Sequence, residues 1–462
     1  MKEFSIIHLV KATAGTLEGP GVSSSPSSFA GVSTDSRTTN AGDCFFAIAG
    51  EKFDGHDYIA DAFAKGAVCA VVSRKFETGR FAGKCLIRVE DTIKALGDLA
   101  TEYRRQAGFK VVAITGSVGK TTTRQIIHHV LSRHFRVHQS PNSFNNNIGV
   151  PLTLLGAPCD VQIVVAELGS NHPGEISYLT RIAEPDIAIV TNTHPAHLEG
   201  FGSLRTIVNE KLSISEGLRP GGILIINADI EPLANACRAR RMRFTTFGQS
   251  EGAKYRVKNI HMDGSASRFT IEGKEVRLPL PGPGNVENAL AAWAVCSELG
   301  LTVGDFALDI ETLSPVSMRA ELLHVGTLTI LSDCYNANPA SMKNALKILA
   351  GLALPDKNRL VFICGEMAEL GPQAPELHAE LGASIAQAGV KLMVAVGELA
   401  KIAGQSAKAT AEYDLQMKCF PDTISTCNNL HEFIKDYDII LIKGSRTAKL
   451  ETVVRKLKEL QI

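Results

Sequence analysis

The chain has 462 residues, of which 45% are hydrophobic and 21% charged, so it is long enough for two or three domains and too apolar to be disordered. Lysine plus arginine number 48, as do aspartate plus glutamate, and this balance excludes the basic field that favours nucleic acid or an anionic membrane. Ten cysteines without a C-x-x-C pair, an N-terminus unlike a signal peptide and no long apolar run predict a cytoplasmic protein without membrane insertion.

The first section, residues 1–108, is predicted to be a small mixed α/β domain. Short β-like runs occupy 45–50 and 67–73, and a helical stretch separates them. The amphipathic pattern of 91–108 ends in a glycine, which predicts a helix that connects this domain to the next.

The middle section, 109–315, is predicted to contain a parallel sheet with helices on both faces. Its apolar runs are continuous rather than alternating, as is typical of buried parallel strands: 110–115, 161–168, 186–193 and 221–229. Helical segments between these runs indicate βαβ units, and an alanine-rich helix over 285–300 closes the section.

The last section, 316–462, alternates strands and helices again. Strands are expected at 328–335, 359–365, 391–397 and 438–445, with helices at 340–350, at 376–388 and at the C-terminal end. This pattern predicts a second doubly wound, Rossmann-like domain, although no G-x-G-x-x-G fingerprint is present. The expected fold is therefore α/β with three domains.

The stretch TGSVGKTTT (115–123) joins a predicted strand to a predicted helix and ends like a phosphate-binding loop. Ile114 stands where the first glycine of the full G-x-x-x-x-G-K-[ST] motif belongs, and Gly116 turns the chain instead. Backbone N–H groups at the start of a helix can still bind an anion. We expect Lys120 to reach the outer phosphates; the alternative is a glycine turn with a solvated lysine, which the strand–loop–helix context disfavours.

Polar residues follow the next two strands, where a magnesium–phosphate site needs oxygen ligands. Glu167 closes an apolar strand and is either a metal ligand or a strand-end acid with a structural partner. His194 and His197 follow the next strand, and a ligand role and a structural role both stay open for them.

Three further features of the sequence are compatible with a functional site, but structural explanations are also available. Lys211, taken alone, is a charge on a helix surface, and the glycines between His197 and Lys211 argue against one continuous helix there. The turn DCYNANPASM (333–342) is either a site or a capped helix start. The turn KGSR (443–446) carries two cations at a strand end and suits an anion.

These motifs together resemble the Mur ligases, ATP-dependent enzymes that build the peptide of bacterial cell-wall precursors. The resemblance covers almost the whole chain, and its remaining motifs are STDSR (33–37), GDCFFAIAGEKFDGHDY (42–58), NSFNNNIGVPLTLL (142–155), AHLEGFGS (196–203), NVENALAA (285–292) and GEMAELG (365–371). It implies an ATP-dependent ligase that joins D-alanyl-D-alanine to UDP-N-acetylmuramoyl-tripeptide through an acyl phosphate. That reaction belongs to peptidoglycan synthesis, and so to cell-wall biogenesis, cell shape and cell division.

The resemblance implies a role for each matching residue in binding ATP and Mg²⁺. The phosphates would be held by Gly116, Ser117, Val118, Gly119, Lys120, Thr121 and Thr122. Thr121, Glu167 and His197 would ligate Mg²⁺, and Lys211 would be the family's carbamylated lysine, which supports a second Mg²⁺. Adenine would face Asn285 and Asn288, while Arg319 and Asp333 would contact phosphate and ribose. The implied catalytic residues are Lys120, Lys211 and His197.

The other substrates are assigned to separate motifs by the same resemblance. The uridine nucleotide would bind Thr34, Asp35, Ser36 and Arg37, and the peptide substrates would lie near Asn146, Asn336 and Asn338. A monomer is expected. One departure from the family is Gly284, which occupies a position usually held by histidine and alters the packing expected around adenine.

The sequence is less consistent with three alternative functions. A family member that adds a diamino acid carries an Asp-Asn-Pro-Arg stretch, which this sequence lacks, and folylpolyglutamate synthase lacks the STDSR domain. A nucleotide-dependent switch without ligase activity needs no support for a second metal, so Glu167, His197 and Lys211 argue against it. The sequence does not distinguish a tripeptide that ends in diaminopimelate from one that ends in lysine.

Overall fold

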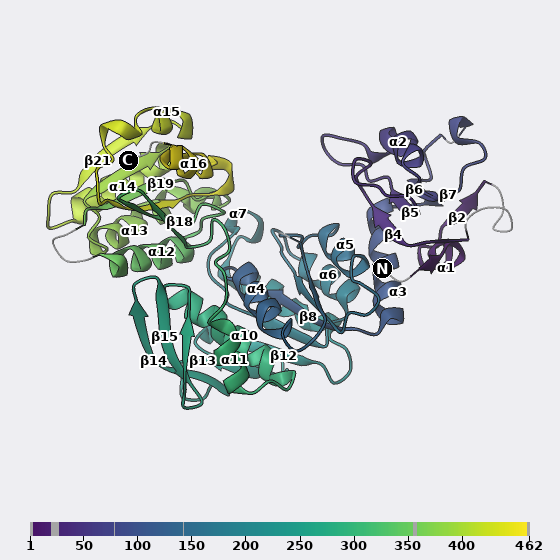
Figure 1. Ribbon diagram of the computed structural model, residues 1–462, viewed down its shortest axis with the longest axis horizontal. Helices are drawn as coiled ribbons and strands as arrows, with labels where there is room; N and C mark the ends of the chain where they lie inside the picture. The colour runs from purple at the N-terminus through teal and green to yellow at the C-terminus, as the bar shows by residue number, and fades with distance from the viewer. Residues whose placement is uncertain (1–2, 20–26, 78, 142, 354–357, 460–462) are drawn as a thin grey trace.

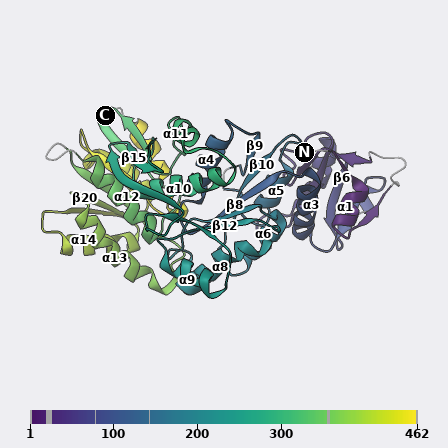
Figure 2. The ribbon, with the colours of Figure 1, turned by 90° about the horizontal axis from the view of Figure 1, so that it is seen from below.

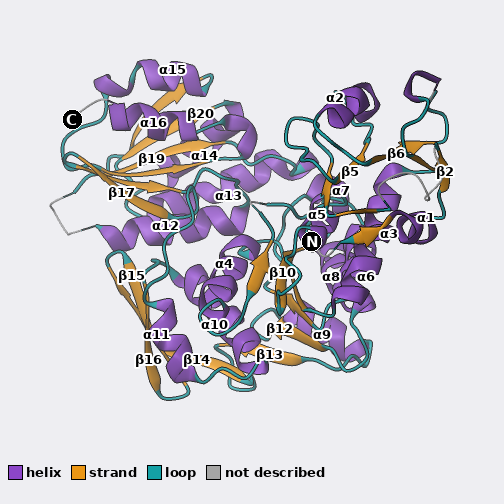
Figure 3. Ribbon diagram, turned by 45° about the vertical axis from the view of Figure 1, so that its right-hand side comes forward, coloured by secondary structure: helices purple, strands orange, loops and turns teal. Residues whose placement is uncertain are grey.

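In the computed structural model, which describes residues 3–19, 27–77, 79–141, 143–353 and 358–459, the chain forms three α/β domains, each built on its own sheet. The central domain lies between the other two, as Figures 1 and 2 show from two sides. Helices and strands occur together in every domain (Figure 3), so the predicted three-domain α/β architecture is confirmed.

The N-terminal domain contains a five-stranded sheet in the order β2-β7-β6-β5-β4. Its strands β4 to β7 are parallel and β2 is antiparallel, with the bounds β2 (Thr16–Glu18), β4 (Gly31–Ser33), β5 (Asp43–Phe46), β6 (Cys69–Ser73) and β7 (Leu86–Val89). A two-stranded ribbon of β1 (Phe4–Ser5) and β3 (Ser28–Phe29) lies beside it. The helical segments are α1 (Ile6–Ala12), η1 (Gly55–Tyr58), α2 (Ile59–Ala64) and η2 (Gly79–Phe81).

Helix α3 (Thr92–Ala107) connects the N-terminal domain to the central domain, as predicted. It begins after Asp91, whose side chain accepts hydrogen bonds from two backbone N–H groups, and ends at Gly108 with φ 73°. The buried Arg104 donates to the carbonyl of Phe109 at 2.6 Å and to Asp186 Oδ2 at 2.7 Å. The helix is thereby fixed to the central domain.

The central domain contains a nine-stranded sheet in the order β16-β15-β14-β13-β12-β11-β8-β10-β9. Strands from β9 to β14 along this order are parallel, and their bounds are β8 (Lys110–Thr115), β9 (Val137–Gln139), β10 (Ile163–Glu167), β11 (Ile187–Val190), β12 (Ile223–Asn227), β13 (Thr245–Gly248) and β14 (Tyr255–Asp263). An antiparallel extension adds β15 (Ala266–Ile271) and β16 (Lys274–Leu278). The prediction included β8, β10, β11 and β12 but omitted the other five, because their sequences are short or polar rather than continuously apolar.

Both faces of the central sheet are covered, since successive residues of β8 point to opposite sides. Val112 and Ile114 pack with α4 (Lys120–Leu131), α10 (Pro283–Glu298) and α11 (Val303–Ile310). On the other face, Val111 and Ala113 share a core with α3 and with α5 (Gly149–Leu155), α6 (Glu175–Ala183), α8 (Leu204–Leu212) and α9 (Glu231–Ala239). The remaining helical segments of this domain are α7 (Leu198–Phe201) and η3 (Ser213–Gly217).

The C-terminal domain contains a six-stranded sheet in the order β17-β18-β22-β19-β20-β21, in which only β17 is antiparallel. Its strands are β17 (Glu321–Val325), β18 (Leu328–Ser332), β19 (Leu360–Gly365), β20 (Leu392–Val396), β21 (Gln416–Phe420) and β22 (Ile439–Lys443). Its helical segments are α12 (Pro339–Leu352), η4 (Gly371–Gln373), α13 (Ala374–Gln387), α14 (Glu398–Thr410), α15 (Thr423–Asn428), η5 (Leu430–Glu432), η6 (Arg446–Ala448) and α16 (Glu451–Glu459). The sequence prediction omitted β17, β21, α14 and α15.

The predicted domain boundaries, after 108 and after 315, fall in the connections that follow α3 and α11. Within the described part of the chain, no helix combines the length and the apolar character needed to cross a membrane.

Candidate active site

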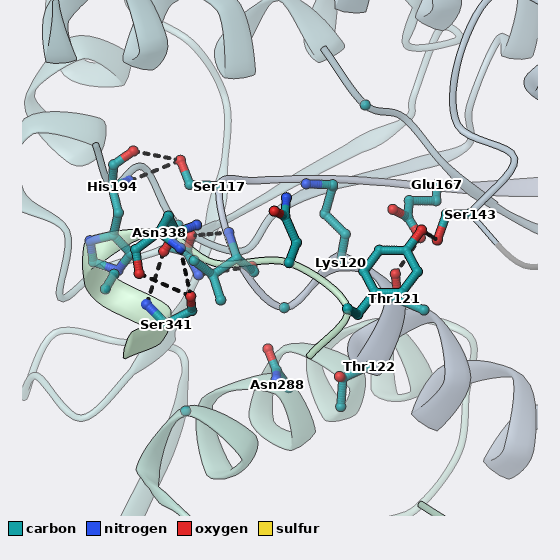
Figure 4. A pocket seen from close by; sticks show the side chains of 18 of the residues that line it. Ser117, Lys120, Thr121, Thr122, Ser143, Glu167, His194, Asn288, Asn338 and Ser341 are labelled. Atoms are coloured by element: carbon teal, nitrogen blue, oxygen red, sulfur yellow. Dashed lines mark hydrogen bonds between the residues drawn. The ribbon is translucent and has the colours of Figure 1, made fainter. Parts of the chain in front are cut away.

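A cavity of about 1120 Å³ lies between the central and C-terminal domains (Figure 4). The strands β8, β10 and β11 of the central sheet end at this cavity, as expected for ligand sites in open α/β sheets. It is lined by most of the predicted site residues, namely Ser117, Val118, Gly119, Lys120, Thr121, Thr122, Asn146, Glu167, His197, Asn285, Asn288, Arg319, Asp333, Asn336 and Asn338. Gly116, Lys211 and the four residues Thr34, Asp35, Ser36 and Arg37 are not part of this lining.

The loop after β8 requires its two glycines. Gly116 has φ 149°, and a Cβ there would lie 2.0 Å from Thr191 Oγ1; Gly119 has φ 85°, and a Cβ there would lie 2.1 Å from Asn288 Oδ1. The loop is therefore pressed against the end of β11 and against α10. Gly119 is also the residue that precedes α4 and offers no side chain to cap it, so the N-terminus of this helix remains suited to an anion.

Lys120 is held close to its own loop, where its ammonium group donates a 2.7 Å hydrogen bond to the carbonyl of Gly116. Burial lowers the pKa of Lys120; Glu167 acts in the opposite direction, and the positive charge of Arg319 lowers the pKa further. A bound phosphate would supply the negative charge that this cluster of cations lacks.

Glu167 ends β10 with 2% of its surface exposed and is the acid nearest the loop. Its carboxylate accepts hydrogen bonds from Thr121 Oγ1 and from Asn145 Nδ2, both at 2.9 Å. The Arg124 guanidinium forms an ion pair with this carboxylate, with Nε 3.8 Å from Glu167 Oε2. A hydroxyl and a carboxylate beside a phosphate loop are ligand types that Mg²⁺ prefers, so this pair fits the predicted metal. No group of three or more histidine, cysteine or acidic side chains among the described residues could hold a metal ion.

The other two predicted metal-site residues have partners outside this pair, although His197 lines the same cavity. His197 Nδ1 pairs with the Glu369 carboxylate of the C-terminal domain, and burial lowers its pKa although Glu369 favours the charged form. Lys211 lies behind the cavity wall, where its Nζ donates to Ser170 Oγ at 2.8 Å. Burial and the charge of Lys120 lower the pKa of Lys211 to about 7. The roles of His197 and Lys211 stay predictions.

The region between these two residues is two helices rather than one, as the glycines predict. Helix α7 ends at Gly202 (φ 69°), and α8 begins after Ser203. The side chains of Leu198 and Phe201 on α7 belong to the hydrophobic core of the C-terminal domain, and the backbone N–H of Glu199 donates to the carbonyl of Glu369. This short helix therefore packs on the neighbouring domain.

Asn285 and Asn288, which are predicted to contact adenine, form hydrogen bonds within the protein. Asn285 Nδ2 donates to the carbonyl of Pro281 at 2.7 Å, and Asn288 Oδ1 accepts a hydrogen bond from Thr123 Oγ1 at 3.3 Å. Gly284 has a packing reason for lacking a side chain, because a Cβ there would lie 2.9 Å from Asn344 Oδ1 of α12. Contact of Asn285 and Asn288 with adenine stays a prediction.

Asp333 anchors a network at the end of β18. It accepts a hydrogen bond from the backbone of Ala320 at 3.1 Å and pairs with Lys443 Nζ at 2.6 Å. Lys443 is 1% exposed and also donates to the carbonyl of Asn336 at 3.0 Å. Lys443 lines the cavity and is already paired with Asp333, and the expectation that the turn KGSR (443–446) binds an anion stays a prediction.

The turn before α12 is a capped helix start. Asn338 Oδ1 accepts from the backbone of Ser341 at 2.9 Å, and the Ser341 hydroxyl accepts in return from the backbone of Asn338 at 3.0 Å. Asn336 uses its side-chain oxygen to accept from the backbone of Ala337. Both asparagines still line the cavity, and their contact with a dipeptide stays a prediction.

The turn from Thr34 to Arg37 follows β4 in the N-terminal domain. Arg37 binds the Asp35 carboxylate with both Nε and Nη2, and this contact lowers the pKa of Asp35 to about 2. Lys65 Nζ donates to the carbonyl of Arg37 at 2.7 Å. A role for this turn in binding a uridine nucleotide stays a prediction.

Several contacts within the cavity were missed by the sequence interpretation, although Ser117 itself was predicted. Asn145 supports Glu167, while Ser117 Oγ donates to the carbonyl of His194 and accepts from its backbone N–H. Tyr335 and Ser143 meet across the two domains. The run of asparagines in the 142–155 motif could have indicated that Asn145 belongs to the site. Asn142, the first residue of that motif, lies outside the described residues. The other contacts join distant parts of the chain and left no local signal.

Three family models match the chain: the Mur ligase family catalytic domain over 28–104, the Mur ligase middle domain over 114–296 and the Mur ligase glutamate ligase domain over 318–446. The UDP-N-acetylmuramoyl-tripeptide–D-alanyl-D-alanine ligase of Bacillus subtilis is 34% identical over 460 residues, which are 98% of each chain. The Escherichia coli enzyme of that name is 35% identical and covers 93% of each chain.

Solved structures are similar to this chain over nearly its full length. A crystal structure of MurF from Acinetobacter baumannii superposes with a TM-score of 0.88 at 30% identity and covers 99% of each chain. MurF ligase from Thermotoga maritima in complex with ADP has a TM-score of 0.80 at 27% identity, covering 93% of this chain and 97% of that one.

Replacing Gly119 with alanine should weaken nucleotide binding at the loop, because the added Cβ would strain the backbone and collide with Asn288. We expect the Kd for ATP, measured by titration calorimetry, to rise at least about tenfold. Gly300→Ala is the matched control, since Gly300 has φ 95° but open space around it. Equal affinities of Gly119→Ala and Gly300→Ala would contradict the loop assignment.

Proposed function

Because the chain belongs to the Mur ligase family, we propose that it is the ATP-dependent ligase that joins D-alanyl-D-alanine to UDP-N-acetylmuramoyl-tripeptide and releases ADP and phosphate. Relatives with this activity in their names match over nearly their full length, and one structural neighbour holds ADP. The observation that carries the proposal is the single cavity in which a phosphate loop, the Thr121–Glu167 pair and Arg319 of another domain converge.

The chemistry has to join a carboxylate to an amine, and a free carboxylate is a poor electrophile. A carboxylate oxygen of the peptide substrate attacks the γ-phosphorus of ATP, the bond to the bridging oxygen of ADP breaks, and an acyl phosphate forms. The neutral amine of the dipeptide then attacks the acyl carbon and phosphate leaves, while a base or water takes the amine proton.

The protein has to bring two anions together for the first step. Lys120 and the N-terminus of α4 supply positive charge at the loop, and Arg319 adds charge from the C-terminal domain. Lys120 must leave the carbonyl of Gly116 to reach a phosphate. Mg²⁺, held by Thr121 and Glu167, would neutralise further phosphate charge.

Carbamylation of Lys211 is a separate prediction that receives no support from the comparisons. The side chain is buried and its pKa of about 7 leaves much of the amine neutral, which is the form that adds carbon dioxide. Intact-protein mass spectrometry with and without bicarbonate tests it, and an active enzyme with an unmodified Lys211 would exclude it.

A cytoplasmic location and a monomeric state complete the proposal. All ten cysteines are free, and seven of them are buried, which suits a reducing compartment. Sedimentation at several protein concentrations tests the monomeric state, and a concentration-dependent rise in mass would contradict it.

The decisive measurement is ADP release with one substrate omitted at a time. We expect ADP formation only when both D-alanyl-D-alanine and a UDP-N-acetylmuramoyl-tripeptide are present. Comparing tripeptides that end in diaminopimelate and in lysine identifies the natural substrate. ATP turnover that is indifferent to both substrates would instead favour a nucleotide-dependent switch.

Lys120→Ala should lower kcat at least about 100-fold, because it removes a charge that stabilises the transferring phosphoryl group. The coupled ADP assay measures this, and the thermal melting curve should remain that of a folded protein. Lys110→Ala provides the control, since Lys110 is an exposed lysine at the start of β8, the strand whose other end leads into the loop. Near-normal ligation by Lys120→Ala would exclude the assigned role.

A further inference from the structure

Tyr335 is a cavity side chain to which the chemistry above gives no role. It lies between β18 and α12 in the C-terminal domain. Its hydroxyl donates a 2.6 Å hydrogen bond to Ser143 Oγ of the central domain, so the contact crosses from one domain to the other. Both residues line the cavity, as do Glu167 and Thr121 (Figure 4).

The ring of Tyr335 supports the Arg319 guanidinium, whose Cζ lies 4.1 Å from the ring centroid. This is a cation–π contact of ordinary geometry. Arg319 faces the same cavity, and its charge contributes to the lowered pKa values of Lys120 and Arg124. The guanidinium is therefore near the phosphate loop while it rests on the ring.

The main chain around Arg319 is fixed in an unusual conformation. Its neighbours Met318 and Ala320 have φ values of 61° and 51°, which are rarely adopted by residues other than glycine. Met318 donates its backbone N–H to Glu321 Oε2 at 2.9 Å, and Ala320 donates to Asp333 Oδ1 at 3.1 Å. These contacts fix the backbone, and the Tyr335 ring supports the long side chain beyond it.

We propose that Tyr335 is a positioning residue for phosphoryl transfer, an inference that rests on the proposed function. Its ring holds Arg319 toward the phosphates, and its hydroxyl ties the C-terminal domain to Ser143 beside the reacting groups. The tie keeps water away from the acyl phosphate. Without it, water attacks the acyl phosphate, the bond between the carboxyl group and the phosphate breaks, and the carboxylate and phosphate are released without an amide.

Two substitutions separate the ring from the hydroxyl. Tyr335→Phe keeps the ring and removes the bond to Ser143, and Ser143→Ala removes the same bond from the other side. Both should raise the ratio of hydrolysed to amidated acyl phosphate, measured as the ADP released in excess of amide divided by the amide formed, by about two- to tenfold, the range for loss of one hydrogen bond. The double variant should be no worse than either single variant, because all three lack one shared interaction.

Tyr335→Leu removes the ring as well. It should also raise the KM for ATP by about fivefold, which corresponds to the loss of one cation–π contact. A purely structural role for Tyr335 would lower the amount of active enzyme without changing the ratio of ADP to amide.

Tyr413→Phe is the matched control. Tyr413 lies in the same domain, donates its hydroxyl to the carbonyl of Ala386 at 2.8 Å and has Lys391 Nζ 4.1 Å from its ring centroid, but it does not line the cavity. We expect this variant to keep the wild-type ratio.

The ratio is measured with purified full-length enzyme at saturating substrates, by quantifying ADP and amide product in the same reaction. A wild-type ratio in both Tyr335→Phe and Ser143→Ala would overturn the inference and leave the ligase assignment intact. Failure of the wild-type enzyme to form amide would instead overturn the proposed function.

Discussion

Repulsion between two negatively charged reactants is the constraint around which the cavity is organised. The peptide carboxylate and the γ-phosphate can meet only where positive charge outweighs negative charge. The structure gathers Lys120, Arg124 and Arg319 around one buried acid, Glu167. These cations repel one another, so binding of an anionic ligand would relieve an electrostatic cost.

The geometry of the parallel sheet brings the phosphate loop and the buried acid together. Strands β8 and β10 end side by side, which places the phosphate loop next to Glu167. Gly116 and Gly119 allow the loop to pack tightly against β11 and α10. The same edge of the sheet faces the C-terminal domain, which contributes Arg319, and so the lining of the cavity is divided between two domains.

Prediction from sequence succeeded where a single segment carries its own signal. The apolar runs of the buried parallel strands and the loop around Lys120 were recognised because periodicity and spacing are local properties. The antiparallel extension β14–β16 was missed because strands exposed on one side have a polar, alternating composition. Contacts such as those of Tyr335 with Ser143 and of His197 with Glu369 are set by the docking of whole domains, so no short stretch of sequence encodes them.

The attachment of α7 to the C-terminal domain determines where the chain can bend. Leu198 and Phe201 are buried among side chains of that domain, although the helix belongs to the central domain by sequence. If the C-terminal domain swings outward to admit substrate, α7 must either travel with it or expose two apolar side chains to solvent. A swing that carries α7 along would have to bend the chain beyond Ile207, because this residue of α8 is buried in the same core, and it would draw His197 away from the phosphate loop at the same time.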